Sequence, residues 1–209
     1  MVNLFLTSEA HNVLDKFVEI FEINPSELTV AFIPTAADFD ENKSYVNLDR
    51  NKLLELGFKV IDINIAGKIE KYLQKRLEKA DIIFVSGGNT FYLLEKSISS
   101  GFDKIVKRLV ERGVYYIGSS AGSVLAGRTI EHVKLLDNAE LASNLKIYDG
   151  LKLIDAMILP HYGNKKYEAR MNQIVKNYAA QKNKIITLTD NQAVIVKDGK
   201  FRIISNDSY

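Results

Sequence analysis

The sequence predicts an α/β protein, in which helices flank a mostly parallel, doubly wound sheet and a β-hairpin lies near the C-terminus. Three observations indicate this fold class. Short apolar runs alternate with longer segments of helical periodicity over about the first 130 residues. These runs are nearly continuous, which is typical of strands buried on both faces of a sheet. Near the end of the chain, two apolar runs flank the turn sequence KDGK, which predicts a hairpin.

Five strand-and-helix repeats account for the N-terminal part of the chain. The predicted strands lie at 3–7, 28–36, 58–63, 81–88 and 114–119. The strands are followed by a helix at 9–22, a helix at 42–57, a helix at 68–79, more than one helix through 89–112, and a short helix from Ser120. Five such repeats predict a parallel sheet that helices cover on both faces.

The C-terminal part follows a different pattern. A buried strand is predicted at 156–160, a helix at 164–181, and strands joined by turns within 185–205. Asp198 and Gly199 are expected at the tip of the hairpin. A chain of 209 residues suits one domain with a sizeable core, so we expect a single α/β domain over 1–209.

Composition excludes several classes of function. The net charge is only +2, with no basic stripe, so nucleic acid is an unexpected partner. The chain has no cysteine and no long apolar segment, which predicts a soluble cytoplasmic protein without disulfides and without a membrane partner. Three scattered histidines show no ligand spacing, so we expect no metal and no cofactor. The sequence leaves the oligomeric state open.

In a doubly wound sheet, side chains that act on ligands gather at the carboxyl ends of the strands. This rule selects the residues that directly follow each apolar run. They are Thr7, Ser8, Pro34, Thr35, Ser86, Gly87, Gly88, Asn89, Ser119, Ser120, His161, Thr189 and Asp190.

Ser120 stands at the centre of a G-x-S-x-G sequence formed with Gly118 and Gly122. This spacing is typical of a nucleophile elbow, a sharp turn from strand to helix that holds the central side chain at the edge of the sheet. Small neighbours are needed because the turn is tight. The alternative is an ordinary strand-to-helix turn without chemistry.

A serine nucleophile needs a base, and the base needs an acceptor that orients it. His161 directly follows a predicted buried strand and is the candidate base, although a purely structural histidine is the alternative. His11 is expected on the solvated face of the first helix, and His132 in a loop away from the strand ends. Asp190 also ends an apolar strand and is the candidate acid. The alternatives Asp137, Glu140, Asp149 and Asp155 are expected to cap or solvate local backbone.

Acyl transfer develops negative charge on an oxygen, which backbone N–H groups can stabilise. The N–H of Ala121, at the start of the helix after Ser120, is one candidate donor. The glycine pair of SGGN at 86–89 brings backbone close to a ligand, so Gly88 is the second candidate. Taken alone, SGGN is also compatible with a phosphate-binding turn, but it lacks the spacing of either nucleotide fingerprint.

These residues make the sequence resemble the peptidase E family of aspartyl dipeptidases and their cyanophycinase relatives. The resemblance lies in SGGNTFYLL at 86–94, GSSAGSVLAG at 118–127, ILPHY at 158–162 and TDNQAVIV at 189–196. It implies a class I glutamine amidotransferase-like fold with serine in place of cysteine. By resemblance, Ser120 is the nucleophile and His161 the base, with Gly88 and Ala121 as the oxyanion hole.

One position departs from the family. The third catalytic member of the dipeptidases is typically glutamate, which falls on Asp190, one methylene shorter. The family's preference for N-terminal aspartate implies a cation near the substrate carboxylate. Lys165, Lys166 and Arg170 follow His161, and Arg170 is the candidate because a guanidinium pairs a carboxylate through two hydrogen bonds. Asn89 and Arg170 are thus the expected substrate-binding residues.

The sequence therefore predicts a serine peptidase that hydrolyses small peptides through an acyl-enzyme on Ser120, as an exopeptidase or dipeptidase with a preference for N-terminal aspartate. The alternative is an inactive ligand-binding or sensing member of the same fold. A third interpretation is an esterase of the α/β-hydrolase type. In that class the acid precedes the histidine, whereas Asp190 follows His161, so this interpretation requires Asp137 or Asp155 as the acid.

Overall fold

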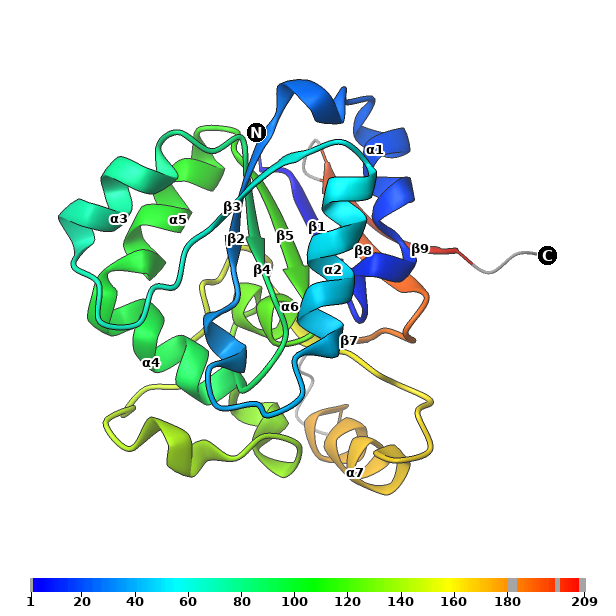
Figure 1. Cartoon of the computed structure of the whole chain (residues 1–209). Coiled ribbons are helices and arrows are strands. Elements are labelled where there is room, and N and C mark those ends of the chain that lie inside the picture. The colour runs from blue at the N-terminus through cyan, green and yellow to red at the C-terminus, as the bar shows by residue number, and fades with distance from the viewer. Residues whose placement is uncertain (1, 180–183, 198–199, 207–209) are drawn as a thin grey trace.

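The structure is a computed structural model that describes residues 2–179, 184–197 and 200–206. At its centre lies a seven-stranded sheet with the strand order β3-β2-β4-β5-β1-β8-β9 (Figure 1). The strands are β1 (Leu4–Thr7), β2 (Thr29–Ile33), β3 (Lys59–Asp62), β4 (Ile82–Val85), β5 (Tyr115–Ser119), β8 (Gln192–Lys197) and β9 (Lys200–Ser205). All pairs among β1 to β5 are parallel, and the β1–β8 and β8–β9 pairs are antiparallel. The predicted fold class is confirmed, and the predicted turn residues Asp198 and Gly199 lie outside the described residues.

Helices cover both faces of the sheet (Figure 1). Successive side chains of a strand point to opposite faces, so Phe5 packs with α1 and α2 while Leu4 and Leu6 pack with the helices on the other side. This two-sided burial explains why the strands read as continuous apolar runs. The helices are α1 (Leu14–Phe21) and α2 (Ser44–Glu55) on one face, and α3 (Glu70–Leu77), α4 (Thr90–Ser100), α5 (Phe102–Glu111) and α6 (Ala121–Ala126) on the other.

One predicted helix differs from its expected form. The segment 9–22 opens with a separate 3-10 turn at Ala10–Asn12 before α1 begins. The helices expected through 89–112 are α4 and α5, and they are separated at Gly101, which adopts the left-handed conformation, with φ 77°, that typically ends a helix. Further 3-10 turns lie at Pro25–Glu27, Thr35–Ala37, Glu131–Leu135 and Ala139–Ala142.

The C-terminal part adds a second, two-stranded parallel sheet. It consists of β6 (Met157–Leu159) and β7 (Ile185–Thr187), with α7 (Glu168–Ala179) between them in sequence. Both strands were predicted, but their separation from the main sheet was not. In the described part of the chain, no helix combines the length and apolarity needed to cross a membrane.

Strand register brings several strand ends to one place. Thr7, the last residue of β1, pairs with Ser119 at the end of β5 and with Ala193 near the start of β8. In the second sheet, Leu159 pairs with Thr187. The segments that follow β1, β5, β6 and β7 therefore lie close together, and the three candidate triad residues Ser120, His161 and Asp190 lie on these segments.

Candidate active site

Ser120 lies at the junction of β5 and α6, in a backbone conformation that is rare for a residue with a side chain. Its φ is 48° and its ψ is −108°. Such a conformation costs about 1–3 kcal/mol and persists only where the surroundings impose it. The Ser120 N–H donates to the carbonyl oxygen of Thr7 at 3.1 Å, which ties the turn to the neighbouring strand. Ser120 is therefore held in a nucleophile elbow.

The two glycines of G-x-S-x-G are required by close backbone packing. A Cβ on Gly122 would lie 2.0 Å from the carbonyl oxygen of Val85, and a Cβ on Gly118 would lie 2.6 Å from the backbone nitrogen of Ser123. Real Cβ atoms essentially never make contacts below 3.0 Å. The elbow thus packs directly onto β4 and onto its own helix, which leaves no room for larger residues.

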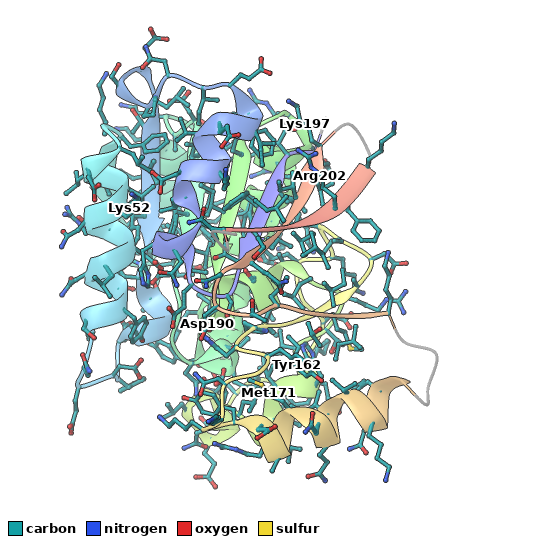
Figure 2. The ribbon with its side chains drawn as sticks, turned by 90° about the vertical axis from the view of Figure 1, so that its right-hand side faces the viewer. Lys52, Tyr162, Met171, Asp190, Lys197 and Arg202 are labelled. Atoms are coloured by element: carbon teal, nitrogen blue, oxygen red, sulfur yellow. The ribbon has the colours of Figure 1, made fainter. Side chains whose placement is uncertain are left out.

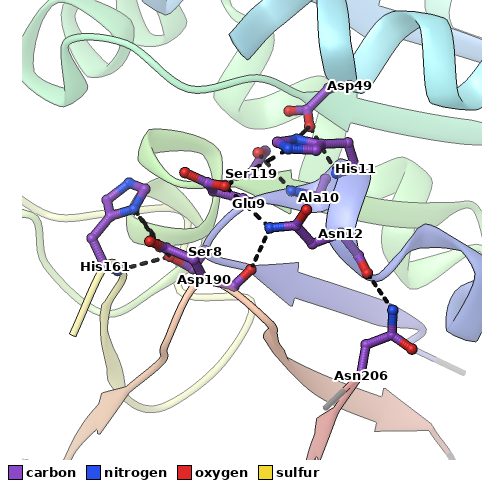
Figure 3. Close-up of polar contacts among 10 residues, drawn as sticks. All are labelled: Ser8, Glu9, Ala10, His11, Asn12, Asp49, Ser119, His161, Asp190 and Asn206. Carbon is purple, nitrogen blue, oxygen red and sulfur yellow. Dashed lines mark hydrogen bonds and ion pairs between the residues drawn. The ribbon is translucent and has the colours of Figure 1, made fainter. Parts of the chain in front are cut away.

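Ser120, His161 and Asp190 form a hydrogen-bonded series. The Ser120 Oγ lies 2.9 Å from Nε2 of His161, and Nδ1 of His161 lies 2.7 Å from Oδ1 of Asp190. Figure 3 shows the second contact, with His161 and Asp190 on adjacent segments. Figure 2 shows Asp190 at the end of the sheet that lies toward α7. The structure therefore brings the three predicted triad residues together.

The hydrogen-bond partners of His161 determine its tautomer. A carboxylate only accepts hydrogen bonds, so Nδ1 of His161 carries the proton that faces Asp190. Nε2 is then free to accept the hydroxyl proton of Ser120. Burial alone would raise the pKa of the Asp190 carboxyl, but hydrogen bonds from His161 and Ser8 outweigh it and hold this pKa below its ordinary value of 3.8. Asp190 therefore stays ionised at neutral pH.

The two predicted oxyanion donors both line the cavity at Ser120. Ala121 is the first residue of α6, and the first N–H groups of a helix lack partners within it. Gly88 has φ 133°, and a Cβ there would lie 2.3 Å from backbone atoms of Ala36. Only glycine fits this position, because the loop passes close to the backbone of Ala36.

Of the two predicted substrate-binding residues, one lines the cavity and the other does not. Asn89 lines the cavity, but its side chain caps α4 by accepting from the Tyr92 N–H at 2.9 Å and donates to the Asn138 carbonyl at 2.8 Å. Arg170 is exposed, donates to the carbonyl of Leu135 at 3.3 Å and does not line the cavity. The structure therefore does not bring Arg170 to Ser120, because the first turn of α7 points its side chain elsewhere.

The cavity has a volume of about 620 Å³, which is suitable for a small ligand. Carboxyl groups dominate its charge. The Tyr45 hydroxyl donates to Asp40, and Asp137 accepts from the Thr90 N–H at 2.8 Å. Burial raises the pKa of the Asp137 carboxyl, and its electrostatic interaction with His161 acts in the opposite direction. Four carboxyl residues line the cavity and form what is called the acidic wall: Glu9, Asp40, Asp49 and Asp137.

Sequence reasoning does not identify the acidic wall. It assigns Asp137 to backbone capping, with the triad acid as an alternative, and in the described residues Asp137 accepts from a backbone N–H and has no hydrogen bond to His161. Asp190 holds the position of the triad acid. Asp155 is exposed and pairs with Arg128. Because Asp190 follows His161 in the chain, the order found in α/β-hydrolases is not met.

The prediction that His11 is solvated is wrong. His11 lies in the 3-10 turn before α1, half-buried at the cavity, with Nδ1 3.1 Å from Oδ1 of Asp49 (Figure 3). The hydrogen bond to Asp49 raises the pKa of His11 above its ordinary value, despite partial desolvation. The tighter turn rotates His11 away from the face that an α-helix would give it.

His11 gives the fold a pH dependence. Because its folded pKa is raised, the stabilisation by the charged imidazole is complete below the unfolded value of 6.5 and is lost as the pH rises through the folded value. We expect the difference in unfolding free energy between the wild type and His11→Asn, from urea titrations, to shrink as the pH is raised from 6.5 into the alkaline range. A difference that stays constant over this range would contradict the assignment.

His132 supports the strand that leads to His161. It is buried, and Nε2 lies 2.8 Å from the carbonyl oxygen of Ile158 in β6. Desolvation lowers its pKa, so it packs as a neutral donor. It does not line the cavity, and its role is structural.

Comparison with known proteins assigns the family. The model of peptidase family S51 matches residues 4–204. The chain belongs to peptidase family S51, and the peptidase E resemblance is confirmed by the relatives that follow.

An uncharacterised peptidase of Listeria monocytogenes is 38% identical over 94% of this chain and 95% of its own length. Peptidase E of Haemophilus influenzae is 27% identical over 87% of this chain and 82% of its own length. A solved structure of a candidate peptidase E protein from Listeria monocytogenes superposes with a TM-score of 0.93 and 35% identity, covering 99% of this chain and all of the other.

Proposed function

We propose that this peptidase is of the serine type and removes residues from small peptides through an acyl-enzyme on Ser120. The observation that carries the proposal is the series from Ser120 Oγ to His161 Nε2 at 2.9 Å and from His161 Nδ1 to Asp190 Oδ1 at 2.7 Å. A serine hydroxyl becomes a competent nucleophile when an oriented imidazole accepts its proton. Membership of peptidase family S51 supports amide bonds as the substrate.

The reaction proceeds in two halves. His161 Nε2 takes the hydroxyl proton of Ser120 as Oγ attacks the scissile carbonyl, and the N–H groups of Ala121 and Gly88 stabilise the resulting oxyanion. The imidazolium then protonates the leaving amine, which departs and leaves the acyl group on Oγ. Water attacks this ester, gives its proton to Nε2, and the proton returns to Oγ as the acid is released. Ionised Asp190 holds the imidazole throughout.

The acidic wall supports an exopeptidase over an endopeptidase. A free peptide N-terminus is an ammonium ion near neutral pH, and carboxylates beside the nucleophile attract it. Asp137 is partly buried, within electrostatic reach of His161, and forms no ion pair in the described structure. We assign it as the principal acceptor for the substrate ammonium group.

This assignment predicts a KM effect. Asp137→Asn is expected to raise KM for unblocked dipeptides about 10-fold or more, since hydrogen bonds to charged groups contribute about 1.5–3 kcal/mol, while kcat falls less. The measurement is steady-state hydrolysis of dipeptides with free and with acetylated N-termini. Glu140→Gln, an exposed carboxyl group three residues along the chain, is the matched control. Equal KM values for Asp137→Asn and the wild type would refute the assignment.

The preference for N-terminal aspartate rests on the resemblance to peptidase E. It requires a cation in the cavity, and Lys166 lines the cavity whereas Arg170 does not. We therefore propose Lys166 as the residue that faces a substrate carboxylate. Hydrolysis of a dipeptide library, read as the profile of released amino acids, tests this preference.

A further inference from the structure

Ser8 is a strand-end residue to which the proposed chemistry gives no role. It follows the last residue of β1, and its side chain is fully buried. Figure 3 shows it beside His161 and Asp190. A buried hydroxyl at this point contacts both members of the pair that would activate Ser120.

The Ser8 hydroxyl joins the backbone of His161 to the side chain of Asp190. Its Oγ accepts from the His161 peptide N–H at 2.7 Å and donates to Oδ1 of Asp190 at 2.7 Å. The same oxygen lies 3.2 Å from Nδ1 of His161. A hydroxyl can donate only one hydrogen bond, and the Ser8 hydroxyl donates it to the Asp190 carboxylate, which can only accept. Nδ1 must therefore keep its own proton, which leaves Nε2 as the acceptor for Ser120.

The backbone of His161 needs this support. Its φ is 61°, a left-handed conformation that is unfavourable for residues with a side chain. The bond from the His161 N–H to Ser8 opposes relaxation toward an ordinary conformation, which would swing the imidazole away from Ser120. The Ser8 hydroxyl thus restrains the His161 peptide group, holds the Asp190 carboxylate that contacts the imidazole, and fixes the tautomer of His161.

We propose that Ser8 is a positioning residue of this active site, whose hydroxyl fixes the orientation and tautomer of His161 by joining its peptide N–H to the Asp190 carboxylate. The inference rests on the serine peptidase function proposed above. It predicts that loss of the hydroxyl slows the chemical step and leaves substrate binding nearly unchanged, because Ser8 acts through His161.

The test compares Ser8→Ala and Ser8→Thr in the full-length protein. Ser97→Ala is the matched control, since Ser97 is fully buried and its hydroxyl has no hydrogen-bond partner in the described structure. For each variant, kcat and KM are measured on a dipeptide that the wild type cleaves, together with the rate at which a fluorophosphonate labels Ser120. Circular dichroism restricts the comparison to folded variants.

We expect Ser8→Ala to lower kcat and the labelling rate about 10- to 100-fold, the effect of a small displacement of a catalytic group, with little change in KM. Ser8→Thr keeps the hydroxyl and is expected to recover most of the rate, and Ser97→Ala to match the wild type. If Ser8→Ala does not fold, Ser8→Cys, a weak donor, replaces it.

Wild-type kcat and labelling in Ser8→Ala would overturn the inference, as would a folded Ser8→Thr that is as slow as Ser8→Ala. Failure of the inference can be told apart from failure of the proposed function. If Ser120→Ala retains turnover, the proposed serine peptidase function is refuted. If Ser120→Ala is inactive and Ser8→Ala is fully active, only the role of Ser8 is refuted.

Discussion

Ser120→Ala is expected to lower kcat/KM for peptide hydrolysis by about 10⁴-fold or more, since loss of the nucleophile leaves only binding and oxyanion stabilisation. The measurement is cleavage of dipeptides with N-terminal aspartate and with other residues, followed by the amount of free amino acid. The fold is expected to remain intact, because the Ser120 hydroxyl contacts His161 and carries no core packing.

The control for this variant is Ser99→Ala. Ser99 is an exposed residue of α4 whose hydroxyl donates to the carbonyl of Lys96, so its loss leaves the site untouched. Undiminished hydrolysis by a folded Ser120→Ala would show that another group attacks the substrate.

Gly122→Ala is expected to have the largest effect on stability. Alanine favours a helix over glycine by about 1 kcal/mol, so propensity alone predicts stabilisation. The new Cβ would lie 2.0 Å from the carbonyl oxygen of Val85 and 2.8 Å from its carbonyl carbon, and backbone atoms of a central strand have little freedom to move. We expect a loss of about 3 kcal/mol or more in unfolding free energy, together with loss of activity, as the elbow is displaced from β4.

Urea titration of this variant is best compared with Gly67→Ala. Gly67 has φ 68°, and a Cβ there meets nothing within 4 Å, so its replacement tests backbone strain without a clash. The strain alone costs about 1–2 kcal/mol. If Gly122→Ala is no less stable than Gly67→Ala, the close packing of the elbow on β4 does not hold the site in place.

Much of the fold could be predicted because its signals are local. The strands β1, β2, β4 and β5 are nearly continuous apolar runs that lead into small or polar residues, so their positions are visible in the sequence. The separate sheet of β6 and β7 could not be predicted in this way. Its pairing joins Leu159 to Thr187, and nothing in either run specifies the distant partner.

The candidate site also has residues that could be predicted from local signals and residues that could not. Ser120, His161 and Asp190 lie at or shortly after the ends of β5, β6 and β7, and the meeting of these strand ends brings them within hydrogen-bond distance. Arg170 lies on a helix, where the direction of a side chain depends on how the helix is rotated, and no pattern in α7 fixes that rotation. His11 was misplaced because a 3-10 turn has a different periodicity from an α-helix.

The central claim is that the Ser120 hydroxyl is made nucleophilic by His161, and covalent labelling tests it most directly. After incubation with a fluorophosphonate, intact mass spectrometry is expected to show one adduct per chain in the wild type, loss of peptidase activity in step with labelling, and no adduct in Ser120→Ala. Full activity without an adduct, or an adduct that persists in Ser120→Ala, would contradict the claim.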